Sequence, residues 1–143
     1  MRASLLPILL LVMTATCAFA QSSAGSDLIV VGNDVGKDRL TQKELRDHFN
    51  ARYNFWKNGK PVVVVLPAPK SPSAPKISEA MYERSVTGMQ KFWLSVVFQG
   101  RANPPVFTES DAETVDYVRK TPGAIGLITS DVPGHRELRI AID

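Results

Sequence analysis

The chain has 143 residues, of which 44% are hydrophobic and 22% are charged, and it contains 9 Gly, 10 Pro and a single Cys. This balance excludes collagen, coiled coil and a wholly disordered chain. One cysteine cannot form an internal disulfide or a cysteine-rich zinc site. The net charge of +3 comes from scattered basic residues, so we expect no nucleic-acid binding.

Residues 1–20 have the pattern of a secretory signal peptide. Arg2 gives a positive start, an apolar run extends from Leu5 to Val12, and Ala18–Ala20 is the small-x-small motif that precedes a cleavage site. We therefore expect cleavage after Ala20, a periplasmic or secreted protein, and no membrane insertion after cleavage. Lipid anchoring at Cys17 stays open as an alternative.

The mature chain is predicted to be a flexible leader over residues 21–26 followed by one domain over residues 27–143. The leader consists of small and polar residues. Apolar runs rich in β-branched residues predict strands in the domain. These runs are Leu28–Val31, Val62–Leu66, Ala124–Ile128 and Leu138–Ile142.

Helices are predicted between these strands. Thr41 with Glu44, and Ser110 with Glu113, have the spacing of capping boxes, which mark helix N-termini. Further helix-compatible sequence begins at Ile77, and we expect Gly88 to separate it from the next helix. An amphipathic stripe that ends before Gly100 is formed by Met89, Phe92, Trp93, Val96 and Val97. This order of elements predicts a single three-layer α/β lobe with a central, mainly parallel sheet flanked by helices.

Most motifs for catalysis or cofactor binding are absent or incomplete in the sequence. Gly32–Asp38 has three residues between its glycines and no Ser or Thr after Lys37, whereas a P-loop needs four residues and that hydroxyl. His48 and His135 have no nucleophile elbow and no metal-ligand spacing around them. We therefore expect no enzyme activity, no metal and no cofactor. A hydrolase that uses His135 is a further alternative, which an experiment has to decide.

Two further groups of residues are candidates for binding. Tyr53, Phe55 and Trp56 are either a sugar-stacking platform or a cover over the core. The loop after the second predicted strand leads into a helix, where backbone N–H groups, hydroxyls and cations attract an anion. Its candidate oxyanion ligands are Lys70, Ser71, Ser73, Lys76 and Ser78. The alternative is a proline-rich surface loop whose Ser and Lys serve solubility.

Several segments together resemble the phosphate ABC-transporter substrate-binding family. In order, they are Leu40–Phe49, Trp56–Val62, Phe92–Trp93, Phe98–Gly100, Val115–Val118 and Pro122–Gly126. That family belongs to the type 2 periplasmic binding proteins, in which two α/β lobes close over an oxyanion. The resemblance runs from about Leu28 to Ser130. It implies a type 2 periplasmic-binding-protein-like fold and a short member with one lobe.

The departures from the family pattern bear on the ligand. Relatives typically carry Ser-Gly-Thr-Arg after this strand, whereas Ser78 stands near the position of the Arg and Leu127 stands where a Tyr is usual. Lys76 replaces a bidentate group by a point charge. We therefore expect at most weak phosphate binding at a half-open site, completed by an envelope protein or a second copy. An accessory interaction module that has lost the ligand site is the alternative function.

Overall fold

A computed structural model of the protein describes residues 28–143. The expected signal peptide, its cleavage after Ala20 and the leader over residues 21–26 lie outside the described residues. The description below therefore concerns the predicted domain from Leu28 onward.

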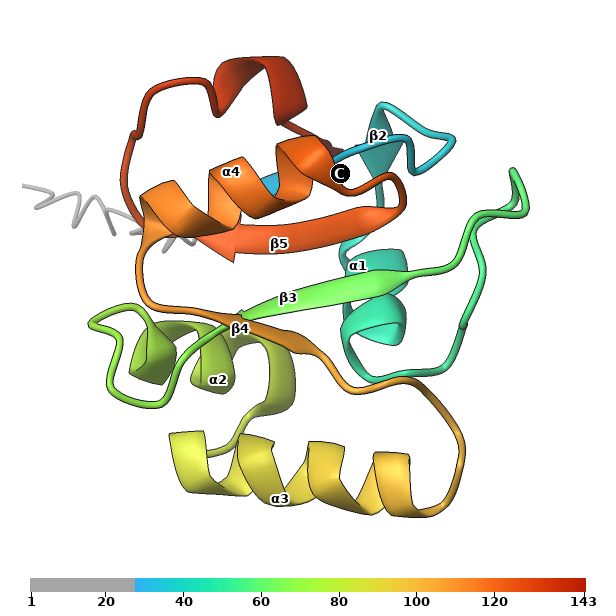
Figure 1. Ribbon diagram of the computed structural model, residues 1–143, viewed down its shortest axis with the longest axis vertical. Coiled ribbons are helices and arrows are strands. Elements are labelled where there is room, and N and C mark those ends of the chain that lie inside the picture. Colours follow the sequence, from blue (N-terminus) through green and yellow to red (C-terminus); the bar gives the residue numbers. More distant parts are fainter. Residues whose placement is uncertain (1–27) are drawn as a thin grey trace, which may run out of the picture.

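The centre of the molecule is a four-stranded sheet with the order β1-β5-β3-β4 (Figure 1). Its strands are β1 (Ile29–Gly32), β3 (Val63–Pro67), β4 (Val106–Thr108) and β5 (Ala124–Ile128). Strand β3 is parallel to both of its neighbours, while β1 runs antiparallel to β5. The sheet is therefore mainly parallel, which confirms the prediction of an α/β lobe.

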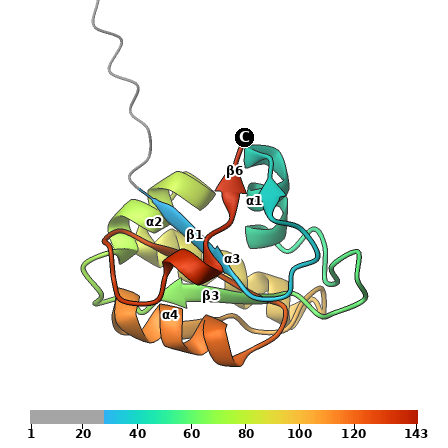
Figure 2. The same cartoon turned by 90° about the horizontal axis from the view of Figure 1, so that it is seen from above.

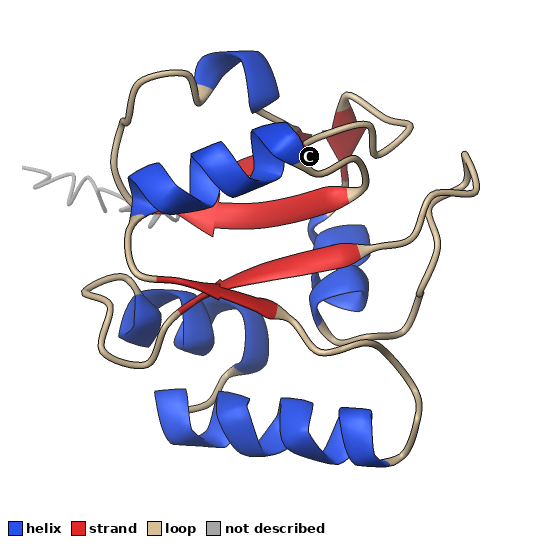
Figure 3. Ribbon diagram, in the orientation of Figure 1, coloured by secondary structure: helices blue, strands red, loops and turns tan. Residues whose placement is uncertain are grey.

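Helices cover both faces of this sheet (Figure 3). The α-helices are α1 (Gln42–Phe49), α2 (Ala74–Tyr82), α3 (Val86–Phe98) and α4 (Asp111–Lys120). A short 3-10 helix (Arg136–Leu138) precedes the last strand. A separate pair of parallel strands is formed by β2 (Arg39–Leu40) and β6 (Ala141–Ile142).

Alternation along the strands divides the core into two apolar layers. Val30 and Leu66 join the layer that packs under α1, α2 and α3, whereas Val31 and Val65 join the layer under α4. Figure 2 shows α4 on one side of the sheet and α1 and α2 on the other. Since neighbouring strand residues point to opposite faces, a sheet with apolar residues throughout needs helices on both sides. The three layers follow from this pattern.

The two helix starts predicted from capping boxes are confirmed, whereas α2 begins at Ala74, before the predicted Ile77. The Glu44 N–H donates to the Thr41 hydroxyl at 3.1 Å, and the Thr41 N–H donates back to the Glu44 carboxylate at 2.9 Å. At α4 the Glu113 N–H donates to the Ser110 hydroxyl at 3.2 Å. The Glu113 carboxylate accepts instead from the N–H of Glu109, one residue before the cap. In this second capping box, the return hydrogen bond to the Glu113 carboxylate therefore comes from the residue before the cap and not from Ser110 itself.

The division between α2 and α3 lies before Gly88, so the prediction for that glycine was wrong. Helix α2 ends at Tyr82 and is followed by the C-cap Glu83, whose backbone is left-handed with a φ of 53°. Ser85 then caps α3 by accepting from the Gly88 N–H at 3.1 Å. Gly88 lies in the first turn of α3, because capping by Ser85 outweighs the low helix propensity of glycine.

The strands β4 and β6 differ from the prediction. Strand β4 was not predicted; it follows the helix-ending Pro104 and Pro105 and pairs with β3. The run Leu138–Ile142 forms only the two-residue strand β6, which pairs with β2 outside the central sheet. Both differences concern very short strands that are stabilised by partners far away in the sequence.

Candidate functional site

The carboxyl ends of three parallel strands meet at one edge of the sheet, on the left in Figure 1. We call it the carboxyl edge. Strand β3 continues there into the Lys70–Ser73 loop and α2, β4 continues into α4, and β5 continues into Thr129 and Ser130. Ligands of α/β proteins bind beyond such strand ends. The residues of the predicted oxyanion loop are therefore described at this edge.

The structure separates the five predicted ligands into two kinds. Lys70 and Lys76 are exposed. Ser71 and Ser73 are buried, and their hydroxyls form a hydrogen bond with each other at 3.0 Å. Ser78 has 0% of its surface exposed, and its hydroxyl donates to the Pro75 carbonyl at 3.1 Å. The loop thus brings Ser71 and Ser73 together, and the Ser78 hydroxyl is engaged within its own helix.

The N-terminus of α2 differs from the other α-helix starts in residues 28–143. Thr41, Ser85 and Ser110 each accept a hydrogen bond from a first-turn amide of the helix that they cap. Ser73, which precedes α2, makes no such hydrogen bond. The first turn of α2 therefore has no capping side chain, although the Ala74 N–H donates to the Ser71 carbonyl at 3.1 Å. A proline in this turn removes one of the donors that an anion would use.

The loop after β5 already holds an anion that belongs to the protein. One oxygen of the Asp111 carboxylate accepts from the N–H groups of Thr129 and Ser130, both at 3.0 Å. The same oxygen accepts from their hydroxyls at 3.1 and 2.8 Å. Asp111 lies in the first turn of α4, where its negative charge also complements the helix dipole. Its four bonds show that an internal carboxylate occupies the hydroxyl-rich part of this edge.

The histidines are engaged in structural contacts. The His48 ring stacks on Trp56, with centroids 4.1 Å apart, and its Nδ1 donates to the Glu44 carbonyl at 2.7 Å. Burial lowers the pKa of His48, so the neutral ring is favoured. His135 is buried with its Nδ1 2.7 Å from the Val132 carbonyl.

Within residues 28–143, no group of three or more His, Cys, Asp or Glu side chains is placed to hold a metal ion.

The aromatic trio is split between core and surface. Trp56 is buried and donates its indole N–H to the Gly123 carbonyl at 2.8 Å. Tyr53 and Phe55 are exposed beside a hollow of about 380 Å³. Trp56 therefore belongs to the core, and only Tyr53 and Phe55 remain available for contact with another molecule.

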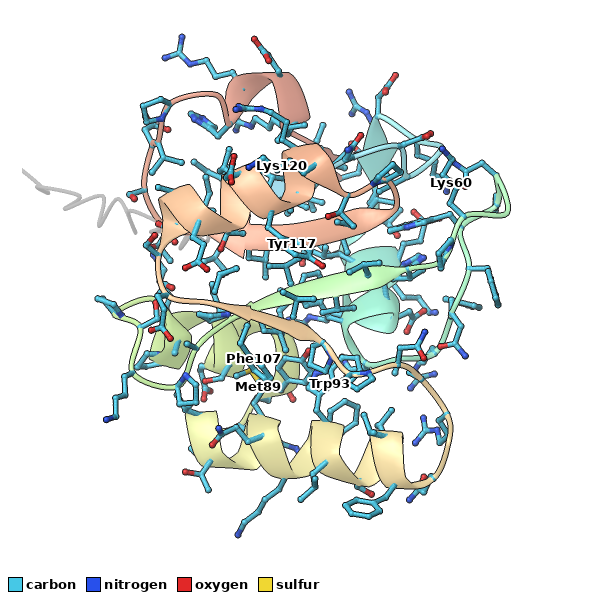
Figure 4. The ribbon with its side chains drawn as sticks, in the orientation of Figure 1. Lys60, Met89, Trp93, Phe107, Tyr117 and Lys120 are labelled. Atoms are coloured by element: carbon cyan, nitrogen blue, oxygen red, sulfur yellow. The ribbon has the colours of Figure 1, made fainter. Side chains whose placement is uncertain are left out.

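A larger apolar depression lies between α3 and β4, and sequence reasoning missed it. We call it the α3–β4 groove; its volume is about 550 Å³. Figure 4 labels Trp93 and Phe107, which line it from α3 and β4. The complete lining is Thr87, Gln90, Lys91, Trp93, Leu94, Val97, Pro104, Pro105 and Phe107. The sequence did contain a sign of an apolar surface here, because Leu94 and Phe98 are large apolar residues outside the predicted inner stripe of α3.

No protein-family model and no curated protein sequence matches the chain. Among solved structures, the chain is similar to an ABC-type phosphate transport receptor from Vibrio cholerae, with 18% identity and a TM-score of 0.45. The match covers 73% of this chain and 42% of the receptor chain, so the protein spans less than half of the receptor's length. Within residues 28–143, no helix has the length and apolar character that a membrane crossing requires.

Proposed function

We propose that the protein is an exported, solute-binding-like lobe that binds an inorganic oxyanion such as phosphate weakly at the N-terminus of α2, without catalysis and without a cofactor. One observation carries the proposal: the first turn of α2 lies at the carboxyl edge without a capping side chain. Lys70 and Lys76 stand at the same turn and add positive charge. Helix N-termini with nearby cations favour anions.

Three features of the edge keep this affinity low. A proline in the first turn of α2 removes a backbone donor. The hydroxyl of Ser78 is taken up by Pro75, and the donors of Thr129 and Ser130 are taken up by Asp111. An oxyanion would therefore be held from one side only. Tight binding would need an envelope protein or a second copy to supply the opposite wall.

Calorimetric titration of the purified protein with phosphate, sulfate and a neutral sugar tests the proposal. We expect saturable heat with the oxyanions and none with the sugar. Lys70→Ala and Lys76→Ala should each weaken phosphate binding, and the difference from wild type should shrink at high salt because exposed charges are screened. Lys57→Ala is the matched control, since its loop lies with Lys60 at the opposite edge of the sheet (Figure 4). Equal affinity in all four proteins would exclude the α2 site.

A second function, an accessory interaction module of the cell envelope, is favoured by a different observation. Leu94, Phe98 and Phe107 expose 59%, 82% and 42% of their surface on one side of the molecule. Clustered apolar side chains on a soluble domain mark contact surfaces for other molecules. The two functions use different residues, because the α2 site involves Lys70 and Lys76 whereas these exposed apolar side chains belong to α3 and β4.

A further inference from the structure

Helix α3 is apolar on two sides. Its inner side buries Met89, Trp93 and Val96 against the sheet and α2. Leu94 and Phe98 are spaced four residues apart, so they lie on one outer stripe, and both are exposed. A helix that is apolar all round is normally covered on all sides. The outer stripe is thus unexplained by the fold of this chain.

The α3–β4 groove gives this stripe a concave neighbour. Leu94 and Val97 line the groove from the helix, and Pro104, Pro105 and Phe107 line it from the strand side. The two prolines have no backbone N–H, so this wall offers few donors to a polar group. A depression of about 550 Å³ with such walls is suited to apolar side chains entering from outside.

The charged side chain in the lining of the groove is basic. From Arg84 to Thr108 the chain contains Arg84, Lys91 and Arg101 and no acidic residue. Lys91 lines the groove itself. The acidic residues that flank this stretch are Glu83, whose carboxylate lies 3.8 Å from Arg46, and Glu109, which is exposed two residues beyond Phe107. A second copy packed on this face would bring cations onto cations, which costs energy, whereas an acidic partner would be attracted.

We propose that the α3–β4 groove docks an acidic segment of another protein, whose apolar side chains enter the groove while its carboxylates pair with Lys91 and the neighbouring arginines. This inference rests on the second function proposed above and adds the place and the chemistry of the partner. The concave shape favours a protein segment over a lipid surface, which prefers protruding side chains.

Selection from a random peptide library displayed on phage tests the proposal with the full protein as bait. We expect the selected peptides to combine Leu, Ile or Phe with several Asp or Glu residues. Binding should weaken about tenfold or more with Leu94→Ser or Phe107→Ser, which remove anchors. Lys91→Glu should weaken it similarly, and high salt should weaken binding to wild type. Tyr53→Ser, an exposed aromatic on another face, is the matched control.

Each other outcome overturns the proposal in a recognisable way. If the selected peptides contain no acidic residues, the partner is not an acidic segment. Acidic peptides that bind all variants equally would leave an interaction module but place its surface elsewhere, whereas no selected peptide at all would remove the second function as well. Co-sedimentation with phosphatidylglycerol vesicles that Leu94→Ser abolishes would reassign the face to lipid. A dimer in sedimentation that Leu94→Ser dissociates would reassign it to a second copy.

The variants are designed so that folding does not decide the result. Leu94 is exposed and Phe107 is partly so, and we expect the melting curves of their serine variants to stay close to wild type. Should Phe107→Ser melt early, Leu94→Ser and Lys91→Glu still test the groove. Phosphate titration of the same variants checks the carboxyl edge independently.

Discussion

The Trp93 indole N–H donates to the Tyr82 hydroxyl at 2.8 Å, and that hydroxyl donates in turn to the Phe49 carbonyl at 2.7 Å. These two bonds join α3, α2 and α1 inside one apolar cluster. The indole can only donate, so the direction of both bonds is fixed. Burial also raises the pKa of Tyr82, which keeps its proton on the hydroxyl.

Removing this hydroxyl should destabilise the protein. Tyr82→Phe keeps the ring but leaves the Trp93 N–H and the Phe49 carbonyl unpaired in the core, which should lower the free energy of unfolding by about 1–3 kcal/mol. Urea unfolding followed by Trp fluorescence measures the change. Tyr53→Phe, at an exposed ring, should change it by less than about 0.5 kcal/mol. Equal losses in the two variants would contradict a role for the bonds.

His48 should make the protein sensitive to mild acid. Its pKa is lowered by burial in the folded state, while in the unfolded chain it returns to about 6.5. Below that value the unfolded state binds a proton that the folded state resists, so stability falls as the pH falls through about 6.5. We expect His48→Gln to lose less stability than wild type between about pH 7.5 and pH 5.

The comparison isolates His48 because both proteins share every other titrating group. Glu44, for example, has its pKa lowered to about 2 by the Lys37 ammonium and the Thr41 backbone, and this contributes stability that is lost as the pH falls from about 4.5 toward 2. That loss should be the same in wild type and His48→Gln. If the stability of the two proteins changes with pH in the same way above pH 5, the buried His48 ring accepts a proton without cost in stability.

Helix α4 packs closely on β5 at Gly126. A Cβ there would lie 2.8 Å from the Thr114 methyl and 3.3 Å from the Val65 Cβ. Gly126→Ala should therefore push α4 away and cost about 1–3 kcal/mol of stability. Thr114→Ser removes the methyl but keeps the hydroxyl that bonds Thr108 at 2.6 Å. The double variant should regain part of the loss in thermal unfolding; additive losses would rule out this contact as the cause.

The sequence predicted best what is determined locally. The reciprocal bonds of Thr41 and Glu44 involve residues three apart, so a short motif specifies them. The β-branched runs at Val62–Leu66 and Ala124–Ile128 predicted β3 and β5 within one residue. Strand β4 has three residues and depends on β3, which is distant in the sequence, so its own residues carried no periodic signal.

The candidate site was harder to predict because burial depends on where a helix starts. Helix α2 starts at Ala74, and this phase buries Ser78 together with Ile77. Its position after the second predicted strand placed Ser78 among the candidate ligands, although it is buried. The acceptor role of Asp111 toward Thr129 and Ser130 joins residues that meet only when β5 lies beside α4, so spacing could not reveal it.

Asp111 should prove to be a built-in competitor for external anions at the carboxyl edge. Asp111→Ala leaves the N–H and hydroxyl donors of Thr129 and Ser130 without their acceptor, and we expect a loss of about 1–3 kcal/mol, since bonds to a charged group are the strong ones. Added sulfate should then raise the melting temperature of Asp111→Ala more than that of wild type, because the anion can accept from the exposed donors.

Asp116→Ala provides the control for general salt effects, because it removes an equal charge from the same helix at an exposed pair with Lys120. Sulfate should stabilise this variant no more than wild type. If Asp116→Ala and Asp111→Ala respond equally, the donors of Thr129 and Ser130 do not take up an external anion. The weak affinity proposed for the α2 site would then have to come from the proline in the first turn of α2, the engaged Ser78 hydroxyl and the missing opposite wall, rather than from the Asp111 carboxylate.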